Sequence, residues 1–360
     1  MILYRKYRPQ KFSDVVGQEH VVRTLQGALQ TGKISHAYLF TGPRGTGKTT
    51  MARILAKAVN CANPKNSDAC AVCDFCTEVE TGRAMDLIEI DAASNRGIDE
   101  IRTLREGTRF SSMNTGKYKV YVIDECHQLT KEASNALLKT LEEPPAKTLF
   151  VLATTEAHKV LPTIISRVQR FDFKKLAVEQ IMVKLASISE TEKIKIEKDL
   201  LRLIALQAEG SLRDAESNFS KLIAFQGKNI NEEAVKEVLG IIPFNFFRDW
   251  FGFVHQKKQA EATVLVNHIY QSGLDLDNFA KGLLDYARRI LVARASPVVA
   301  ASFQGDIGAE HAQAIVDLAK DLDSKRLSQV IGILMRAREE MKSSPIPQLP
   351  LELAIAELTT

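Results

Sequence analysis

The sequence has no run of about 18 apolar residues, so it predicts no helix that spans a membrane. Its start, MILYRKYRPQKFSDVVGQ, is charged and lacks the apolar segment of a secretory signal, and we therefore expect a cytoplasmic protein. Neither sign of charge dominates, because 48 basic and 44 acidic residues leave a net charge of +4. This balance permits contact with nucleic acid but does not by itself predict it.

Cysteine is scarce: there are five, and four of them lie between residues 61 and 76. A disulfide framework is not expected in a cytoplasmic chain, so the cluster favours a metal site. The rest of the composition is ordinary, with 45% hydrophobic and 26% charged residues, which excludes collagen-like, mucin-like and disordered chains. A length of 360 residues predicts roughly two to three domains.

The first 175 residues alternate short apolar runs with helical patterns, which predicts an α/β fold: a parallel sheet covered by helices on both faces. The runs are almost continuously apolar, as expected for strands buried in such a sheet. The predicted strands lie at 37–40, 86–91, 119–124, 148–155 and 170–173. The predicted helices between them lie near 47–60, 98–109, 133–143 and 160–166.

Strand patterns end near residue 176, and apolar residues at helical spacing follow. Gly210 is a predicted helix stop between two of these segments. GIIPF at 240–244 predicts a boundary, because a glycine and a proline flank an apolar pair. We expect a sheet domain at 1–175, a small helical domain at 176–240 and an all-α domain at 241–360.

The strongest motif is GPRGTGKT at 42–49, which matches the phosphate-binding pattern G-x-x-x-x-G-K-[ST]. It follows an apolar strand and opens a helix, so a chance glycine-rich turn is a poor alternative. Glycines let backbone N–H groups wrap around phosphates, Lys48 reaches the β- and γ-phosphates, and Thr49 can hold Mg²⁺. The predicted nucleotide-binding residues are Gly42, Pro43, Arg44, Gly45, Thr46, Gly47, Lys48, Thr49 and Thr50.

A second motif, KVYVIDE at 119–125, brings two carboxylates to the end of a buried strand, where α/β sheets place their ligands. Beside a phosphate-binding loop, Asp124 is expected to support Mg²⁺. Glu125 is expected to orient and polarise the attacking water. A surface carboxylate pair is the alternative, and the neighbouring loop disfavours it.

The third motif is the spacing Cys61-x₈-Cys70-x₂-Cys73-x₂-Cys76. Four thiolates close a tetrahedral zinc site and leave no position for water, so we expect a structural metal. An iron–sulfur cluster is the alternative, because the last three cysteines share the C-x₂-C-x₂-C run of bacterial ferredoxins; no cysteine follows at the expected fourth position. Cys126 is interpreted as a small, semi-buried hydrophobic residue.

Three further residues are weaker candidates. Thr155 ends a predicted strand, where its hydroxyl could touch the γ-phosphate or the water. Arg167 and Arg213 could stabilise charge on a transferring phosphate, in cis or from a neighbouring subunit, although by position alone a surface ion pair is the better explanation of either arginine. Three histidines form no constellation with a serine or cysteine nucleophile, and structural or exposed roles are expected for His36, His127 and His158.

Together these motifs resemble the gamma/tau family of bacterial DNA polymerase III, the ATPases of sliding-clamp loaders. The resemblance covers residues 4 to about 214 and is carried by RPQKFSDVVGQEH, HAYLFTGPRGTGKTT, the cysteine insertion, DAASN, YVIDECHQL, NALLKTLEEPP, FVLATTE, ISR and GSLRDA. The cysteine insertion is the most specific of these, because related AAA+ loaders and branch-migration motors resemble the rest without it. The last third of the chain fits in length and helical character.

The resemblance implies an AAA+ ATPase domain, a helical lid and a helical collar that assembles with delta and delta-prime subunits and further copies of the chain. ATP binding would let the assembly open the sliding clamp and grip primer–template DNA; DNA would then trigger hydrolysis. The implied cofactors are ATP, Mg²⁺ and Zn²⁺. Thr155 matches the family's sensor, Arg167 the arginine that reaches into the neighbour's site, and Arg213 the sensor of the lid.

Two departures accompany the resemblance. Val168 follows Arg167 where the family usually has cysteine, and the long carboxyl-terminal extension of the tau form is absent from the 360 residues, which fits either a short gamma-like form or a piece of a longer chain. No nucleotidyl-transfer site is found. The alternatives are a non-catalytic scaffold like the delta-prime subunit, a branch-migration or helicase-loading motor, and a plain zinc-dependent DNA-binding module; the intact Lys48 and Thr49 disfavour the first.

Overall fold

The computed structural model describes residues 2–108, 117–296, 298–299, 303 and 307–360. They form two compact units, Met1–Leu239 and Gly240–Thr360. The second unit begins at the first residue of the predicted boundary segment GIIPF, whereas the boundary predicted near 175 falls within the first unit and stays a prediction. Within the described residues, no helix combines the length and the apolar character needed to cross a membrane.

The first unit is built around a five-stranded sheet in the order β2-β3-β4-β1-β5. All neighbouring strands are parallel, with β1 between β4 and β5, so that Leu39 pairs with Leu152 and with Arg170. This confirms the predicted α/β class. The strands are β1 (Ala37–Thr41), β2 (Leu87–Asp91), β3 (Lys119–Asp124), β4 (Thr148–Thr154) and β5 (Gln169–Asp172).

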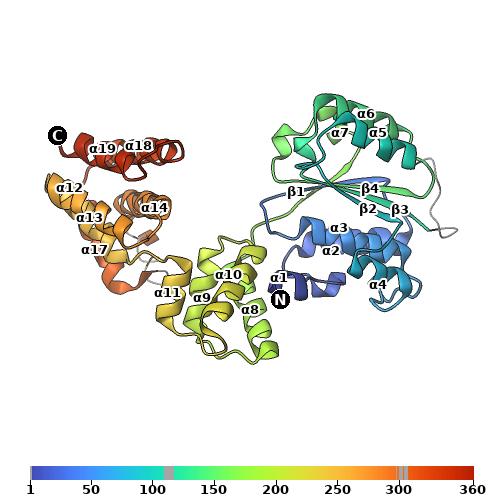
Figure 1. The fold of residues 1–360 in the computed structure, drawn as a ribbon, viewed down its shortest axis with the longest axis horizontal. Coiled ribbons are helices and arrows are strands. Elements are labelled where there is room, and N and C mark those ends of the chain that lie inside the picture. The colour runs from blue at the N-terminus through green and yellow to red at the C-terminus, as the bar shows by residue number, and fades with distance from the viewer. Residues whose placement is uncertain (1, 109–116, 297, 300–302, 304–306) are drawn as a thin grey trace. The chain divides into compact units, whose positions relative to one another are not determined.

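Helices cover both faces of this sheet (Figure 1). Alternate side chains of one strand enter different cores: Tyr38 and Phe40 pack toward α2 and α3, and Leu39 packs toward α5, α6 and α7. The helices are α2 (Glu19–Thr31), α3 (Lys48–Asn60), α4 (Asp74–Thr81), α5 (Ile98–Gly107), α6 (Lys131–Glu142) and α7 (Pro162–Ile165). Residue 109, the last of the helix predicted near 98–109, lies outside the described residues. Short 3₁₀ turns are Phe12–Asp14, Cys126–Gln128 and Ala157–Lys159.

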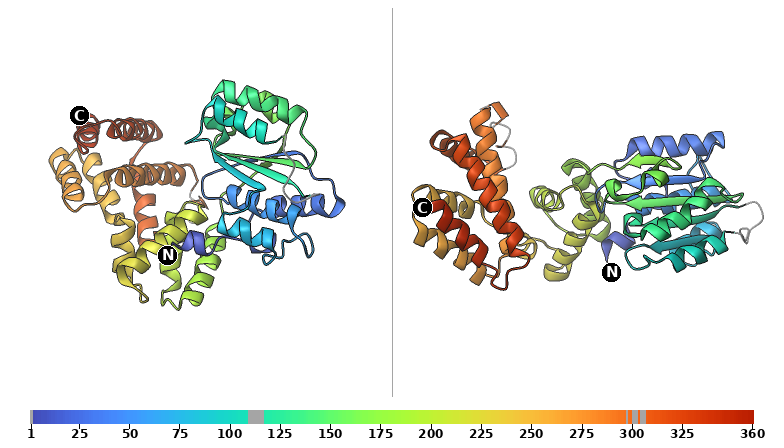
Figure 2. Two further views of the ribbon diagram at one scale, coloured as in Figure 1. Left: turned by 45° about the vertical axis from the view of Figure 1, so that its right-hand side comes forward. Right: turned by 90° about the horizontal axis from the view of Figure 1, so that it is seen from above.

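A cluster of helices follows the sheet within the first unit, as Figure 2 shows from two further directions. Its members are α8 (Val178–Glu192), α9 (Lys198–Gln207), α10 (Leu212–Gln226) and α11 (Glu232–Leu239). The N-terminal helix α1 (Leu3–Lys6) packs on α10, where the Leu3 N–H donates to Ser220 Oγ at 3.1 Å. The first residues of the chain therefore join this cluster to the sheet.

The second unit is helical and has its own hydrophobic core. The aromatic-rich segment at 244–253 contributes Trp250 and Phe251, both buried in this core. Gly282 lies directly against the Phe247 ring, where a Cβ would stand 2.4 Å from the ring carbons. The helices are α12 (Phe244–His255), α13 (Gln259–Gln271), α14 (Leu276–Ala295), α17 (Ala309–Asp321), α18 (Ser324–Met341) and α19 (Leu349–Thr359).

Candidate functional site

The phosphate-binding loop connects β1 to α3, as the motif predicts. Gly42, Gly45 and Gly47 all have positive φ angles, of 145°, 76° and 100°. At Gly42 a side chain is also excluded by space, because a Cβ would lie 2.4 Å from the Phe173 carbonyl oxygen. The loop conformation therefore requires glycine at these positions.

Lys48 begins α3 and is buried, with 6% of its surface exposed. Its ammonium group donates to the carbonyl oxygens of Gly42 at 2.8 Å and Pro43 at 2.9 Å. Burial lowers the pKa of Lys48, and the charges of Glu125 and Asp124 oppose this shift. The loop thus holds a poorly solvated cation at the place where an anionic phosphate would complete its coordination.

Asp124 ends β3 and faces the start of α3. Its Oδ2 accepts a hydrogen bond of 2.6 Å from Thr49 Oγ1. A hydroxyl and a carboxylate in contact are two oxygen ligands of the kind that Mg²⁺ prefers. The predicted partners of the cation therefore meet in the fold.

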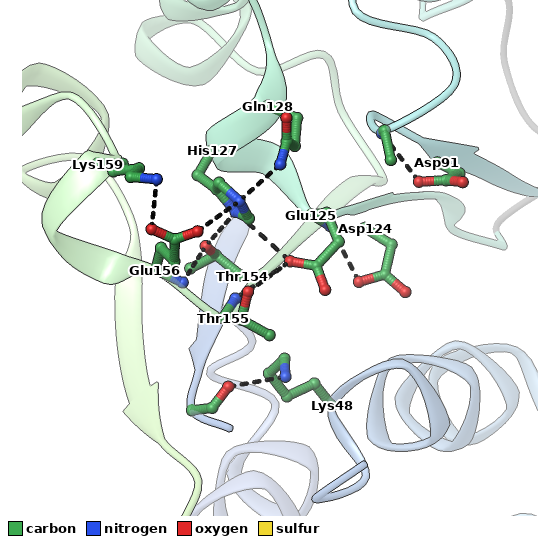
Figure 3. A network of polar contacts seen from close by, with 12 residues as sticks. Lys48, Asp91, Asp124, Glu125, His127, Gln128, Thr154, Thr155, Glu156 and Lys159 are labelled. Carbon is green, nitrogen blue, oxygen red and sulfur yellow. Dashed lines mark hydrogen bonds and ion pairs between the residues drawn. The ribbon is translucent and has the colours of Figure 1, made fainter. Parts of the chain in front are cut away.

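Glu125 follows β3 in a left-handed conformation, with φ of 48°. Its Oε2 accepts hydrogen bonds from Thr155, from the backbone N–H at 3.2 Å and from Oγ1 at 3.0 Å (Figure 3). Strand β4 ends at Thr154, one residue earlier than expected, so Thr155 belongs to the turn after the strand. The carboxylate predicted to orient water is thus held by the threonine predicted to sense the phosphate.

His127 belongs to this network and was not predicted from the sequence, nor were its partners Thr154 and Glu156. Its side chain is 3% exposed, its Nδ1 lies 2.9 Å from Thr154 Oγ1 and 3.4 Å from Glu125 Oε2, and its Nε2 lies 3.4 Å from Glu156 Oε1 (Figure 3). It is therefore buried between two carboxylates, whereas His158 is 76% exposed as expected. In the sequence, the only indication of this role is that His127 follows Glu125 by two residues.

A cavity of the first unit opens on the phosphate-binding loop. Predicted residues that line it are Arg44, Gly45, Thr46, Gly47, Lys48, Thr49, Thr50, Asp124, Glu125 and Arg213. Residues that were not predicted also line it: Tyr4, Arg8, Pro9, Val15, Val16, Leu176, Leu212 and Glu216. The second set is mostly apolar and comes from three distant parts of the chain, so no local motif could reveal it.

Arg213 reaches this cavity from the start of α10. Its guanidinium lies 5.0 Å from the centre of the Tyr4 ring, a cation–π contact. The helix start also abuts the phosphate-binding loop, because a Cβ on Gly45 would stand 1.9 Å from Ser211 Oγ. The structure therefore brings Arg213 to the side of its own nucleotide loop.

Arg167 lies elsewhere, between α7 and β5. Its Nε and Nη2 donate to Glu142 Oε1 at 2.9 and 2.6 Å, and its Nη1 donates to the Thr163 carbonyl at 2.8 Å. Arg167 is not among the described residues that line the cavity of its own chain. Its side chain is one-third exposed, on the surface, as expected from its position after a helix.

The four cysteines predicted to bind metal lie between the end of α3 and the first turn of α4, which contains Cys76, and their Sγ atoms all lie within 4.8 Å of one another. A zinc ion with four bonds of about 2.3 Å requires sulfur atoms about 3.8 Å apart, and separations of at most 4.8 Å permit this with a small adjustment. In a multi-iron cluster the cysteines bind different irons and stand farther apart. The arrangement therefore fits a single tetrahedral ion bound by Cys61, Cys70, Cys73 and Cys76.

Backbone hydrogen bonds support this donor set. The N–H of Cys70 donates to Cys61 Sγ at 3.2 Å, and the N–H of Cys73 donates to Cys70 Sγ at 3.3 Å. Hydrogen bonds from the backbone of Val72 and Cys73 lower the pKa of Cys70 to about 6, so this thiol is ready to act as a thiolate at neutral pH. By contrast, burial raises the pKa of the isolated Cys126 to about 12, in keeping with a packing role.

Three family models match successive parts of the chain. Residues 17–177 match "DNA polymerase III, delta subunit", residues 180–227 match "DNA polymerase III clamp loader subunit, ATPase lid domain", and residues 230–360 match "DNA polymerase III subunits gamma and tau domain III". The matched segments follow the sheet, the helical cluster and the second unit in order.

Relatives match over nearly the whole chain. The DNA polymerase III subunit tau of Bacillus subtilis is 40% identical over 99% of this chain, which spans 62% of that protein's length. The subunit gamma of Buchnera aphidicola is 35% identical over 98% of this chain and 97% of its own length. Among solved structures, the RuvB Holliday junction branch migration motor of Thermotoga maritima matches with a TM-score of 0.50 and 19% identity over 69% of this chain and 79% of its own, a likeness of fold alone.

Proposed function

This chain belongs to the gamma/tau family of DNA polymerase III, and we propose on that premise that it is an ATPase subunit of a sliding-clamp loader. ATP binding lets the assembly open the clamp, and hydrolysis triggered by primer–template DNA completes loading. The observation that carries this proposal is the meeting of Lys48, Asp124 and Glu125 at one cavity. A delta-prime-like scaffold would not need this arrangement.

Several residues at and beside the cavity have a proposed task. The loop amides and Lys48 bind the phosphates, and Thr49 with Asp124 would hold Mg²⁺, which supplies charge neutralisation at the phosphates when bound. Glu125 orients and polarises the attacking water, and Thr155 fixes the carboxylate for this task through two hydrogen bonds. Arg213 approaches the phosphates of its own chain from α10.

Arg167 is assigned to the neighbouring subunit's site. Its separation from the cavity of its own chain supports a role in trans, for which the one-third exposed guanidinium would exchange its ion pair with Glu142 for the phosphate of another subunit. An arginine supplied in trans stabilises the charge of phosphoryl transfer. The partners of this assembly are delta and delta-prime subunits, other copies of this chain, the sliding clamp and primer–template DNA.

The cysteine cluster is assigned to one structural zinc ion. Four ligands occupy every position of a tetrahedral ion, so no water is activated there and the metal stabilises the segment between α3 and α4. An iron–sulfur cluster is the alternative that elemental analysis distinguishes. We expect one zinc per chain and no visible iron–sulfur absorption.

The rate of ATP hydrolysis, measured with and without primer–template DNA and with and without a sliding clamp, tests the function. A clamp-loader ATPase is stimulated by the two together, whereas a branch-migration motor or a DNA-binding module gains nothing from the clamp. Lys48→Ala should abolish ATP binding, and Glu125→Gln should keep binding but lose hydrolysis. Full hydrolysis by the Glu125→Gln protein would contradict the assignment of the water-orienting group.

A further inference from the structure

His127 is a buried side chain beside Glu125, and neither phosphate binding nor the proposed magnesium site uses it. It lies in the 3₁₀ turn that follows β3, and its side chain is 3% exposed. Figure 3 shows its ring between the carboxylates of Glu125 and Glu156. Both ring nitrogens therefore face polar side chains of the protein, and the contacts of each nitrogen indicate what the ring can do.

The Nδ1 side of the His127 ring faces two oxygen atoms. Nδ1 lies 2.9 Å from Thr154 Oγ1 and 3.4 Å from Glu125 Oε2. Thr154 Oγ1 accepts the Glu156 N–H at 2.9 Å and can accept a second hydrogen bond. A carboxylate oxygen can only accept, so a bare Nδ1 would turn its lone pair toward the negative charge of Glu125. The geometry therefore favours a hydrogen on Nδ1, directed at these two oxygens.

The Nε2 side of the ring faces Glu156 and Gln128. Nε2 lies 3.4 Å from Glu156 Oε1 and 3.1 Å from the side-chain amide of Gln128. The amide offers a hydrogen from its nitrogen or a lone pair from its oxygen, so it fits Nε2 with or without a hydrogen. Glu156 is itself held by Lys159 at 2.6 Å, and this hydrogen bond lowers the pKa of Glu156. The contacts at Nε2 therefore hold the ring with Nδ1 toward Glu125.

Glu125 is held through one of its two carboxylate oxygens. Its Oε2 accepts hydrogen bonds from the Thr155 N–H at 3.2 Å and hydroxyl at 3.0 Å, and His127 Nδ1 is the third group beside this oxygen. Among the described residues no hydrogen bond to Oε1 is seen, and Glu125 lines the nucleotide cavity. Contacts at Oε2 thus leave Oε1 available to a water molecule.

We propose that His127 is a positioning residue for ATP hydrolysis: its Nδ1 hydrogen attracts Glu125 Oε2 and keeps the carboxylate turned so that Oε1 orients the attacking water. This inference rests on the proposed function, since it takes hydrolysis as the reaction. His127 is not among the described residues that line the nucleotide cavity, so it acts through Glu125. Its loss should slow hydrolysis without weakening nucleotide binding.

Two replacements separate the two ring nitrogens. In His127→Asn the side-chain amide reaches the place of Nδ1 and can still donate to Glu125, whereas in His127→Gln it reaches the place of Nε2 and cannot. The rate is measured as single-turnover ATP hydrolysis by the assembled loader with clamp and primer–template DNA. Calorimetry with MgADP gives the nucleotide affinity of the full chain. We expect the asparagine variant to stay within about threefold of the wild-type rate and the glutamine variant to lose about tenfold or more, both with unchanged affinity.

A matched control is His158→Gln, because this histidine is 76% exposed and contacts Glu156 at 3.8 Å rather than Glu125. It should hydrolyse ATP at the wild-type rate. A second comparison adds His127→Gln to Glu125→Gln. If His127 acts through Glu125, the slow residual rate of Glu125→Gln should not fall further, whereas a general structural defect would lower the rate in both backgrounds.

Three results would overturn the role of His127: wild-type hydrolysis by His127→Gln, equal losses in the asparagine and glutamine variants, or a further loss in the Glu125→Gln background. If His127→Gln does not fold, His127→Leu, which fills the space without polar atoms, replaces it in each comparison. If the wild-type loader hydrolyses ATP and Glu125→Gln does not, while His127→Gln matches wild type, the proposed function stands and the role of His127 is wrong. If the wild-type loader does not hydrolyse ATP, the proposed function itself is wrong.

Discussion

Replacing Thr155 by valine tests how the attacking water is oriented. Thr155 Oγ1 donates to Glu125 Oε2 at 3.0 Å, and the Thr155 N–H donates to the same oxygen at 3.2 Å. Valine keeps the shape of the side chain and the backbone donor but removes the hydroxyl. The change therefore removes one of two hydrogen bonds that fix this carboxylate.

The expected loss follows from the kind of hydrogen bond. A hydrogen bond to a charged acceptor contributes a net stabilisation of about 1.5–3 kcal/mol. If Glu125 must hold this orientation in the transition state, kcat falls by about 10- to 100-fold. The remaining N–H bond places the expected value at the lower end of that range.

The assay is steady-state ATP hydrolysis by the assembled loader with clamp and primer–template DNA, together with nucleotide affinity of the chain alone. We expect Thr155→Val to lower kcat with little change in affinity, and Thr155→Ser to restore much of the rate. A serine variant as slow as the valine variant would show that the hydroxyl is not responsible. Wild-type kcat in Thr155→Val would refute the reasoning, and a matching loss of affinity would instead indicate contact with the phosphate.

Three further expectations follow from the same site. Arg167→Ala should leave the nucleotide affinity of the isolated chain unchanged but lower hydrolysis by the assembled loader about 10³- to 10⁵-fold. Mixing Arg167→Ala chains with Lys48→Ala chains should restore part of the rate. Loss of activity in an isolated Arg167→Ala monomer would indicate action in cis. Chelation of the metal should release one zinc per chain, measured by elemental analysis, and make the segment between α3 and α4 sensitive to protease while nucleotide binding persists; loss of binding would contradict a purely structural site. Gly45→Ala should weaken nucleotide binding at least about tenfold, because the φ of Gly45 is 76° and the added Cβ would collide with Ser211. Gly32→Ala is the control: its φ is 67° but no atom lies near the added Cβ, so only backbone strain of about 1–2 kcal/mol is expected, measured by thermal unfolding. Equal nucleotide binding by the two variants would exclude the collision.

Sequence patterns predicted the sheet because each of its strands is a local signal. The run from Val120 to Ile123 is apolar on both faces, and the structure buries both faces under helices. The phosphate-binding loop was equally predictable from the sequence, because it is one contiguous segment whose glycines have no substitute at positive φ. The cysteine cluster was predictable for a related reason: two x₂ spacings bring three thiolates close to one another, and Cys61 supplies the fourth.

The end of β4 and the surroundings of His127 were harder to predict. β4 was predicted to end at Thr155 but ends at Thr154. Thr155 therefore lies in the turn after the strand, where its hydroxyl and its N–H both donate to Glu125. His127 was expected to be structural or exposed because it forms no recognisable constellation with a serine or cysteine nucleophile in the sequence. Its partners Thr154 and Glu156 come from a different strand end, which only the parallel pairing of β3 and β4 brings beside it.

The lining of the cavity shows why residues beyond the phosphate-binding loop are harder to predict than the loop itself. A phosphate is bound largely by backbone N–H groups of one loop, so its site has a sequence pattern. The other lining residues come from the N-terminal segment, the segment after β5 and α10, and none of these carries a motif of its own. By sequence, Glu216 is one more acidic residue on an amphipathic helix, and only the fold shows that it is buried and lines the cavity. Packing between distant segments, which no local pattern encodes, therefore determines this part of the cavity.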